Sequence, residues 1–430
     1  MAEQELSPRN LVLGVINGTL IWASQAFLDP TTVLTVFALD LMGGNVLWVG
    51  VLISLITMGT YWPQAVLASV FESQPRYMPY YRLSTVLRVI ARFGIWLAIA
   101  GVGASQPLTL FIVVVVLLFA FTSAAGVGIT PFYGIVGDTI PVTWRGKFFG
   151  LRFLLGGIAS LGAGLYVKHV LSQASGFTFP DNYAHLALLT AITGLVGWGV
   201  FCFMSESAHP SRSRRLALGK QLARGPRLFR RNANFRRLVR ARAFFEIAQA
   251  LCLPFIVPFA LQVGGVAKAL VGLFLVARML SFSGGSILWS YISDNIGNRL
   301  LLLISGICAI ALPAMILLGP RVPQAPLLPS YGLDLRDGYF VLVFAMAGLF
   351  LGSQLLGQTN YLLEISDTRT RPTYLGFYFS VLIPLAWMPL VGSLIIGHAG
   401  RYQLGFVLSL VAGIGLLINA VNLGEPRNED

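Results

Sequence analysis

The sequence predicts an all-α membrane protein of twelve transmembrane helices, arranged as two parallel halves of six helices each. Composition, the spacing of apolar runs and an internal repeat support this fold class. Of the 430 residues, 56% are hydrophobic and only 11% are charged, whereas soluble domains have about 45–50% apolar and about 25% charged residues. A soluble core could not bury this much apolar surface. Lipid must therefore surround most of the chain.

The apolar runs are long and are separated by short clusters of glycine, proline and charged residues. A helix needs about 20 apolar residues to cross about 30 Å of hydrocarbon. Because the bilayer interior offers no water to unpaired backbone groups, each run should form a helix. The spans that we predict are 11–38, 47–70, 82–103, 107–132, 148–170, 183–204, 243–262, 267–291, 300–319, 338–362, 373–397 and 402–422.

The basic residues predict the orientation of these helices. Of the 30 Lys and Arg residues, 12 fall between residues 212 and 242, which separates the first six spans from the last six. If the N-terminus is cytoplasmic, inside loops and tails hold 21 basic residues and outside loops hold five, as the positive-inside rule requires. We therefore expect a multi-pass protein of the inner (cytoplasmic) membrane with both termini cytoplasmic. The same rule explains the net charge of +13, so we expect no nucleic-acid partner.

An internal repeat relates the two halves. A shift of 222 residues superimposes matching landmarks in the same order: Phe37-Ala38-Leu39 on Phe259-Ala260-Leu261, Gly43 on Gly265 and Gly50 on Gly272. This order indicates that a unit of six helices is repeated. We expect an N-terminal half at 1–204, a basic cytoplasmic linker at 205–242 and a C-terminal half at 243–430.

Two short segments carry a resemblance to a known family. Residues 290–299, between the eighth and ninth spans, read SYISDNIGNR, and residues 68–76, at the same place in the first half, read ASVFESQPR. Both resemble the signature that the major facilitator superfamily carries between the second and third helices of each half, roughly Gly-x-x-x-Asp-Arg-x-Gly-Arg-Arg. The second copy keeps Asp294, whereas the first has Glu72 at that place. The resemblance implies a secondary transporter that works by alternating access.

Charged residues at the cytoplasmic ends of helices are candidates for a gating latch. A carboxylate at a helix end interacts favourably with the positive N-terminus of a neighbouring helix or with a loop arginine. Such contacts would hold the halves together in one state and break in the other. The alternative is a set of solvated loop charges that only determine topology. The candidate latch residues are Glu72, Asp294, Asp138, Arg145, Asp367 and Arg371.

Charges inside the spans predict the substrate or coupling site, because each costs about 2.5–3.5 kcal/mol on insertion scales. Asp29 lies about nine residues from the outer end of the first span, and Arg278 about eleven from the outer end of the eighth. At 1.5 Å per residue their depths differ by about 3 Å. The resemblance implies that helices at both positions line a central cavity. Asp29 would then carry a coupled proton; the alternative is a permanent ion pair that holds the halves together.

Other polar residues in the spans complete the candidate site. Amides hydrogen-bond hydroxyl or amide groups and tryptophan stacks on rings, although each could equally join two helices. The residues that we expect to contact substrate are Gln25, Trp62, Gln249, Gln354 and Gln358, with Asn17, Gln64 and Asn360 as further polar positions. For Arg88, Arg92 and Glu246 we expect side chains that reach the cytoplasmic interface, with Glu246 as a second candidate for protonation.

No catalytic constellation is visible in the sequence. The four histidines are scattered, and neither a nucleotide-binding loop nor a metal-ligand spacing is present. We expect no enzymatic activity, no cofactor and no metal. The predicted function is secondary active transport of a small organic solute, in either direction, by a monomer in the lipid bilayer. The alternative is a non-transporting membrane partner or assembly factor that retains the transporter fold, which the weaker first-half signature favours.

Overall fold

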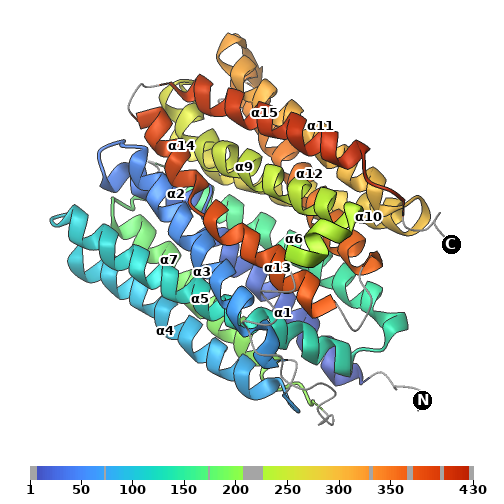
Figure 1. Ribbon diagram of the computed structural model, residues 1–430. Helices are drawn as coiled ribbons and strands as arrows, with labels where there is room; N and C mark the ends of the chain where they lie inside the picture. The colour runs from blue at the N-terminus through green and yellow to red at the C-terminus, as the bar shows by residue number, and fades with distance from the viewer. Residues whose placement is uncertain are drawn as a thin grey trace. The chain divides into compact units, whose positions relative to one another are not determined.

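The computed structural model describes residues 7–71, 74–172, 175–206, 226–328, 333–365, 371–397 and 401–425. Helices dominate these residues (Figure 1). The helices are α1 (Pro8–Phe27), α2 (Val33–Leu41), α3 (Leu47–Phe71), α4 (Met78–Val102), α5 (Pro107–Thr139), α6 (Val142–Val170), α7 (Asp181–Phe201), α9 (Ala233–Gln262), α10 (Val271–Asn295), α11 (Asn298–Leu318), α12 (Leu335–Glu364), α13 (Arg371–Leu385), α14 (Met388–Gly397) and α15 (Tyr402–Val421). A short antiparallel pair, β1 (Pro326–Leu328) and β2 (Leu333–Asp334), precedes α12.

The predicted all-α membrane class is confirmed. In the described part of the chain, eleven helical spans are long and apolar enough to cross a membrane. The first predicted span, 11–38, is not among them, because a non-helical segment at residues 28–32 separates α1 from α2. Pro30 lies in this break, and a proline can neither donate the helical hydrogen bond nor fit the helix interior. The eleventh predicted span, 373–397, is likewise divided into α13 and α14, beside Pro384 and Pro389.

The helix α9 begins ten residues before the predicted start of the seventh span at 243. The side chain of Asn232 caps it by accepting a hydrogen bond from the backbone N–H of Phe235 at 2.9 Å. Its first turns are rich in arginine. Arginine has a high helix propensity, but its charge disfavours burial in lipid. The boundary was misplaced because hydropathy marks where a helix enters lipid, not where it starts.

The chain forms two compact units, each described by itself below. The first contains residues 1–28, 55–163 and 177–223, and the second contains 29–54, 164–176 and 224–430. The helices α3 and α6 contribute residues to both. The predicted division into halves at residues 204 and 243 stays a prediction about the repeat.

In the first unit, α1 packs against α7, and α4 packs against both α5 and α7. The helices α4 and α5 run side by side in Figure 1. One face of α4 exposes large apolar side chains, among them Leu83 and Ile90 at 56% and 62%, as a lipid-facing helix requires. Glu206 caps the start of α4, where its carboxylate accepts hydrogen bonds from the backbone N–H groups of Tyr77 at 2.6 Å and Met78 at 2.8 Å.

In the second unit, α11 packs against α12 and α15, and α15 also packs against α9 (Figure 1). The helix α10 packs along α12. A capping box starts α12: Asp337 N–H donates to the side chain of Asp334 at 2.8 Å, and Asp334 N–H donates to the side chain of Asp337 at 3.2 Å. These contacts satisfy backbone donors that the first turn leaves unpaired.

Two pairs of glycines from the predicted repeat have matching structural roles. Gly43 and Gly265 both have positive φ, +62° and +67°, a conformation that favours glycine. Gly50 and Gly272 both lie where another segment comes too close for a side chain. The repeated landmarks therefore mark equivalent turns and close approaches.

Candidate functional site

Asp29 lies in the break between α1 and α2. Its Oδ1 accepts hydrogen bonds from the backbone N–H groups of Thr31 and Thr32, both at 3.0 Å, and from their hydroxyl groups at 3.0 and 2.9 Å. An aspartate that accepts bonds from the residues two and three positions later closes a turn in this way. The intervening Pro30 has no N–H to leave unpaired. The local sequence therefore explains both the break and the position of the carboxylate.

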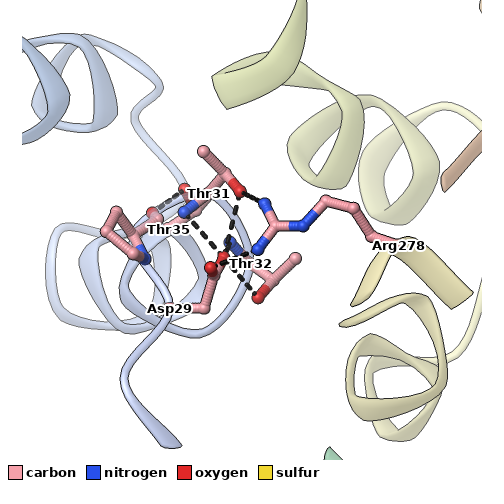
Figure 2. Close-up of polar contacts among 6 residues, drawn as sticks. Asp29, Thr31, Thr32, Thr35 and Arg278 are labelled. Atoms are coloured by element: carbon pink, nitrogen blue, oxygen red, sulfur yellow. Dashed lines mark hydrogen bonds and ion pairs between the residues drawn. The ribbon is translucent and has the colours of Figure 1, made fainter. Parts of the chain in front are cut away.

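Arg278 on α10 points at this turn (Figure 2). Its Nη2 forms an ion pair with Asp29 Oδ2, and its Nη1 donates to the Thr31 hydroxyl. The side chains of Arg278 and Asp29 are only 8% and 6% exposed. Every one of these contacts to Asp29 is made by a donor, so together they recognise a carboxylate. The structure brings the two predicted residues together; the coupling role of Asp29 stays a prediction.

Further contacts within the second unit join segment 29–54 to C-terminal residues. They are an ion pair between Asp40 and Lys268, a hydrogen bond from the Gln262 amide to the Gly44 carbonyl at 2.9 Å, and one from Leu390 N–H to the Ser54 hydroxyl at 2.9 Å. A Cβ at Gly272 would collide with the backbone of Gly164 and Lys168. Segments far apart in the chain therefore meet here through charges, hydrogen bonds and close backbone packing.

A second polar cluster joins α9, α12 and α13. Glu246 forms an ion pair with Arg242, one turn earlier on α9, and accepts a hydrogen bond from the Gln249 amide. Arg242 also donates to Gln358 Oε1 at 2.8 Å, and the same oxygen accepts the hydroxyl of Tyr378. Three helices thus direct charged and amide groups toward one another inside an apolar environment.

Gln354 lies one turn before Gln358 on α12, so the two amides share a helix face. Gln354 is fully buried, and neither its Oε1 nor its Nε2 has a hydrogen-bond partner among the described residues. The Nε2 of Gln358 has none there either. An unsatisfied buried polar group costs about 1–3 kcal/mol. These amides are therefore the groups with most to gain from a bound solute.

The remaining predicted substrate residues lie in the first unit and do not form one site there. Trp62 Nε1 on α3 donates to the Ser123 hydroxyl on α5 at 2.9 Å. Asn17 donates to the Gly197 carbonyl at 2.7 Å and accepts a hydrogen bond from Arg152 at 2.9 Å. Both make the helix-joining contacts that were the alternative to substrate binding. Gln25 is exposed on α1.

The expectation that Arg92 reaches the cytoplasmic interface is wrong. The helix α4 starts at Met78, so Arg92 lies fourteen residues along it, about 21 Å at 1.5 Å per residue. It is only 4% exposed, and its guanidinium carbon lies 3.9 Å from the centroid of the Phe121 ring. Glu246, at 3% exposure, is also buried, because Arg242 and Gln249 hold its carboxylate inside the bundle.

For three of the predicted latch residues the structure describes no side chain. Glu72 and Asp367 lie outside the described residues, and Arg371 is the first residue of α13. Asp138 lies in the last turn of α5. Arg145 donates hydrogen bonds to two carbonyl oxygens at the end of α5, at 2.7 and 3.2 Å, and so fastens the start of α6 to it.

Asp294 is exposed in the last turn of α10, and its neighbours form a hydrogen-bond network around the buried Ser293 and Asn298. Ser293 donates to Asn298 Oδ1 at 2.7 Å, Asn298 Nδ2 donates to Glu364 Oε1 at 2.9 Å, and Asn360 Nδ2 donates to Ser293 Oγ at 2.9 Å. The signature segment therefore ties α10, α11 and α12 together. Asn298 does so at a position where the family pattern has arginine. The latch role of Asp294 stays a prediction.

Sequence reasoning missed Arg242 and Tyr378. Arg242 was assigned to the linker, although its spacing from Glu246, four residues on, is that of an ion pair on one helix face. Tyr378 had no distinguishing signal, because an aromatic residue in an apolar run is normally read as packing. Within the described ranges, no group of three or more His, Cys, Asp or Glu residues is placed to hold a metal ion.

Comparison with known proteins identifies the fold. No family model matches the chain, and no curated protein matches it by sequence. Solved structures match along nearly its whole length. The nucleoside transporter NupG superimposes with a TM-score of 0.67 and 12% identity, over 97% of this chain and 100% of its own. A D-xylose-proton symporter gives 0.67 and 12% over 97% and 98%, and a bacterial homologue of the iron transporter ferroportin gives 0.67 and 10% over 97% and 99%.

The chain therefore shares the polytopic helical fold of these three proteins. More narrowly, this is the fold of the major facilitator superfamily, and the resemblance read from residues 68–76 and 290–299 is confirmed at the level of fold. The cargoes named for the three matching proteins differ, so the fold leaves the solute to be argued from side chains.

Proposed function

We propose that this protein is a secondary transporter of the inner membrane that moves a small organic solute by alternating access. The observation that carries the proposal is the polar cluster of α9, α12 and α13, with the unpartnered amides of Gln354 and Gln358. Polar groups are costly inside a membrane-spanning bundle and usually mark a pathway for substrate or ions. The three matching proteins are transporters or transporter homologues by name, which supports a transport function, and the nucleoside and xylose transporters support an organic solute.

The solute would be held by hydrogen bonds on the α12 amides. Gln354 offers an acceptor and two donors, and Gln358 offers the donors of Nε2. A solute with hydroxyl, carbonyl or amide groups matches this set. Arg242 would orient Gln358 by donating to its carbonyl oxygen, and Glu246 would hold Arg242 in place through their ion pair.

The Asp29–Arg278 contact would act as a gate. On the predicted topology, residues 29–54 form the outer end of the first two spans. The contacts of this segment with Arg278, Lys268, Gln262 and Leu390 would then close the outer side. Alternating access requires that they break when the protein opens outward. This favours the ion-pair interpretation of Asp29 over the coupling one.

Proton coupling is proposed as the energy source, with two carboxylates to be compared. Asp29 was the candidate from sequence. Glu246 contacts Arg242 and Gln249 directly beside the α12 amides, so its protonation would alter the solute site itself. One of the matching proteins is a proton symporter by name, which supports this energy source.

A ligand-dependent thermal-shift screen on the purified protein, followed by flux of the hit in proteoliposomes, tests the proposal. Gln354→Leu should remove or weaken the ligand response and the flux while the protein remains folded. The matched control is Gln403→Leu, because Gln403 is exposed on α15. Binding without flux in the unmodified protein would favour the non-transporting membrane partner instead.

A further inference from the structure

We propose that the first unit holds a binding site for an anionic group, a carboxylate or a phosphate, at Arg88 and Arg92. The two residues lie one turn apart on α4 and are 7% and 4% exposed. They are on the face that packs against α5 and α7, whereas the opposite face exposes apolar residues such as Leu83 and Ile90. Two positive charges are thus directed into the unit rather than toward lipid.

Two aromatic rings support the guanidinium groups. The guanidinium carbon of Arg88 lies 4.9 Å from the centroid of Trp198, and that of Arg92 lies 3.9 Å from the centroid of Phe121. The centroids of the two rings are 5.6 Å apart. A cation is attracted to the face of a ring, but a ring supplies no full negative charge. The rings therefore position the arginines without neutralising them.

Among the described residues, the hydrogen-bond partners of these two arginines are neutral. Neither forms an ion pair with a described carboxylate. Arg88 donates to neutral acceptors, the Ser84 carbonyl at 3.2 Å and the Thr85 hydroxyl at 3.4 Å. Nε and Nη1 of Arg92 are buried and have no hydrogen-bond partner in the described chain. An unpaired buried charge is strongly destabilising, so two of them one turn apart require an anion.

The donor set suits an oxyanion. A guanidinium binds carboxylate or phosphate through parallel N–H bonds, and Arg92 offers two unused nitrogens. A soluble organic anion supplies such an oxyanion. A phospholipid headgroup carries the same phosphate chemistry.

The test is thermal unfolding of the full-length protein at constant ionic strength. Chloride is replaced stepwise by succinate or inorganic phosphate, and separately the protein is compared in phosphatidylcholine nanodiscs with and without phosphatidylglycerol. The melting temperature of the unmodified protein should rise and saturate. Arg92→Met should weaken the apparent affinity by about 10- to 100-fold, the loss expected for a hydrogen bond to a charged group. A response to soluble anions assigns a solute, and a response only to phosphatidylglycerol assigns a lipid.

Arg82→Gln is the matched control, because Arg82 lies on the same helix but is exposed; it should respond to anions like the unmodified protein. Without added anion, Arg92→Met should melt no lower than the unmodified protein, because it removes an unpaired charge. Arg92→Lys keeps the positive charge but loses the parallel N–H donors of the guanidinium, so it should weaken anion binding as well. A melting temperature insensitive to every anion and lipid, or an Arg92→Met protein that responds normally or melts well below the unmodified protein, would overturn the inference. Flux is measured separately, so transport without an anion response contradicts this site alone.

Discussion

Asp29→Asn separates the charge of Asp29 from its role in the turn. Asparagine closes such turns about as well as aspartate, so the bonds from Thr31 and Thr32 to Oδ1 should persist. At the other oxygen an amide N–H group would face Arg278, donor against donor. Both side chains of the pair are less than a tenth exposed, at 6% and 8%. Removing one partner of a buried ion pair costs about 3–5 kcal/mol, and we expect a loss of that size.

Two further variants make the prediction specific. Asp29→Ala should cost about 1 kcal/mol more than Asp29→Asn, because the bonds within the turn are lost as well. The double variant Asp29→Asn, Arg278→Gln should recover most of the loss, because no unpaired charge remains. The measurement is denaturant-induced unfolding of the purified protein in detergent, read as a double-mutant cycle. An Asp29→Asn protein of unchanged stability, or a double variant no better than the single one, would refute the reasoning.

The same variant separates gating from proton coupling. If Asp29 carries the coupled proton, the folded Asp29→Asn protein should bind solute and exchange it between pools but lose pH-driven accumulation. Normal pH-driven accumulation in that protein would exclude Asp29 as the carrier. Glu246→Gln would then be expected to abolish accumulation.

Three other predictions concern topology, the latch and packing. Cysteines introduced at 205–242 should be labelled only from the cytoplasmic side, and labelling from outside would overturn the orientation. Asp294→Asn should slow transport and shift the balance of inward-open and outward-open states without loss of expression; unchanged flux and populations would reduce Asp294 to a topology charge. Gly272→Ala should destabilise the protein by about 1–3 kcal/mol through overpacking against Gly164. Gly284→Ala on the same helix, with open space around it, should be neutral or stabilising by up to about 1 kcal/mol, and equal effects of the two substitutions would contradict the close approach.

The membrane class was predictable because hydropathy acts over whole helices. The break at Pro30 was not predicted. Hydropathy averaged over the first span hides the effect of one proline and of the turn that Asp29 closes beside it. The start of α9 was misplaced for the opposite reason, because basic turns outside the lipid remain helical. In each case hydropathy indicates whether a segment lies in lipid or in water, whereas hydrogen bonding decides where the helix begins and ends.

The candidate site was predictable only where the depth of a residue in the membrane could be estimated from its distance to the end of its span. Asp29 and Arg278 meet because their distances from the span ends are similar and both charges need a partner. The contacts of Gln358 with Arg242 and Tyr378 depend on how three helices rotate against one another, which helical periodicity does not specify. Arg92 was misjudged because its place near the start of a span suggested the interface, whereas its burial and its contact with Phe121 depend on how α4 packs against α5.

Counterflow in proteoliposomes tests the central claim most directly. Vesicles loaded with the solute found by thermal shift should accumulate external labelled solute, saturably and only when the protein is present. Gln354→Leu should reduce this exchange strongly, and Gln403→Leu should leave it unchanged. A solute that binds and stabilises the protein but shows no protein-dependent exchange would contradict transport and leave a membrane partner that has kept the transporter fold.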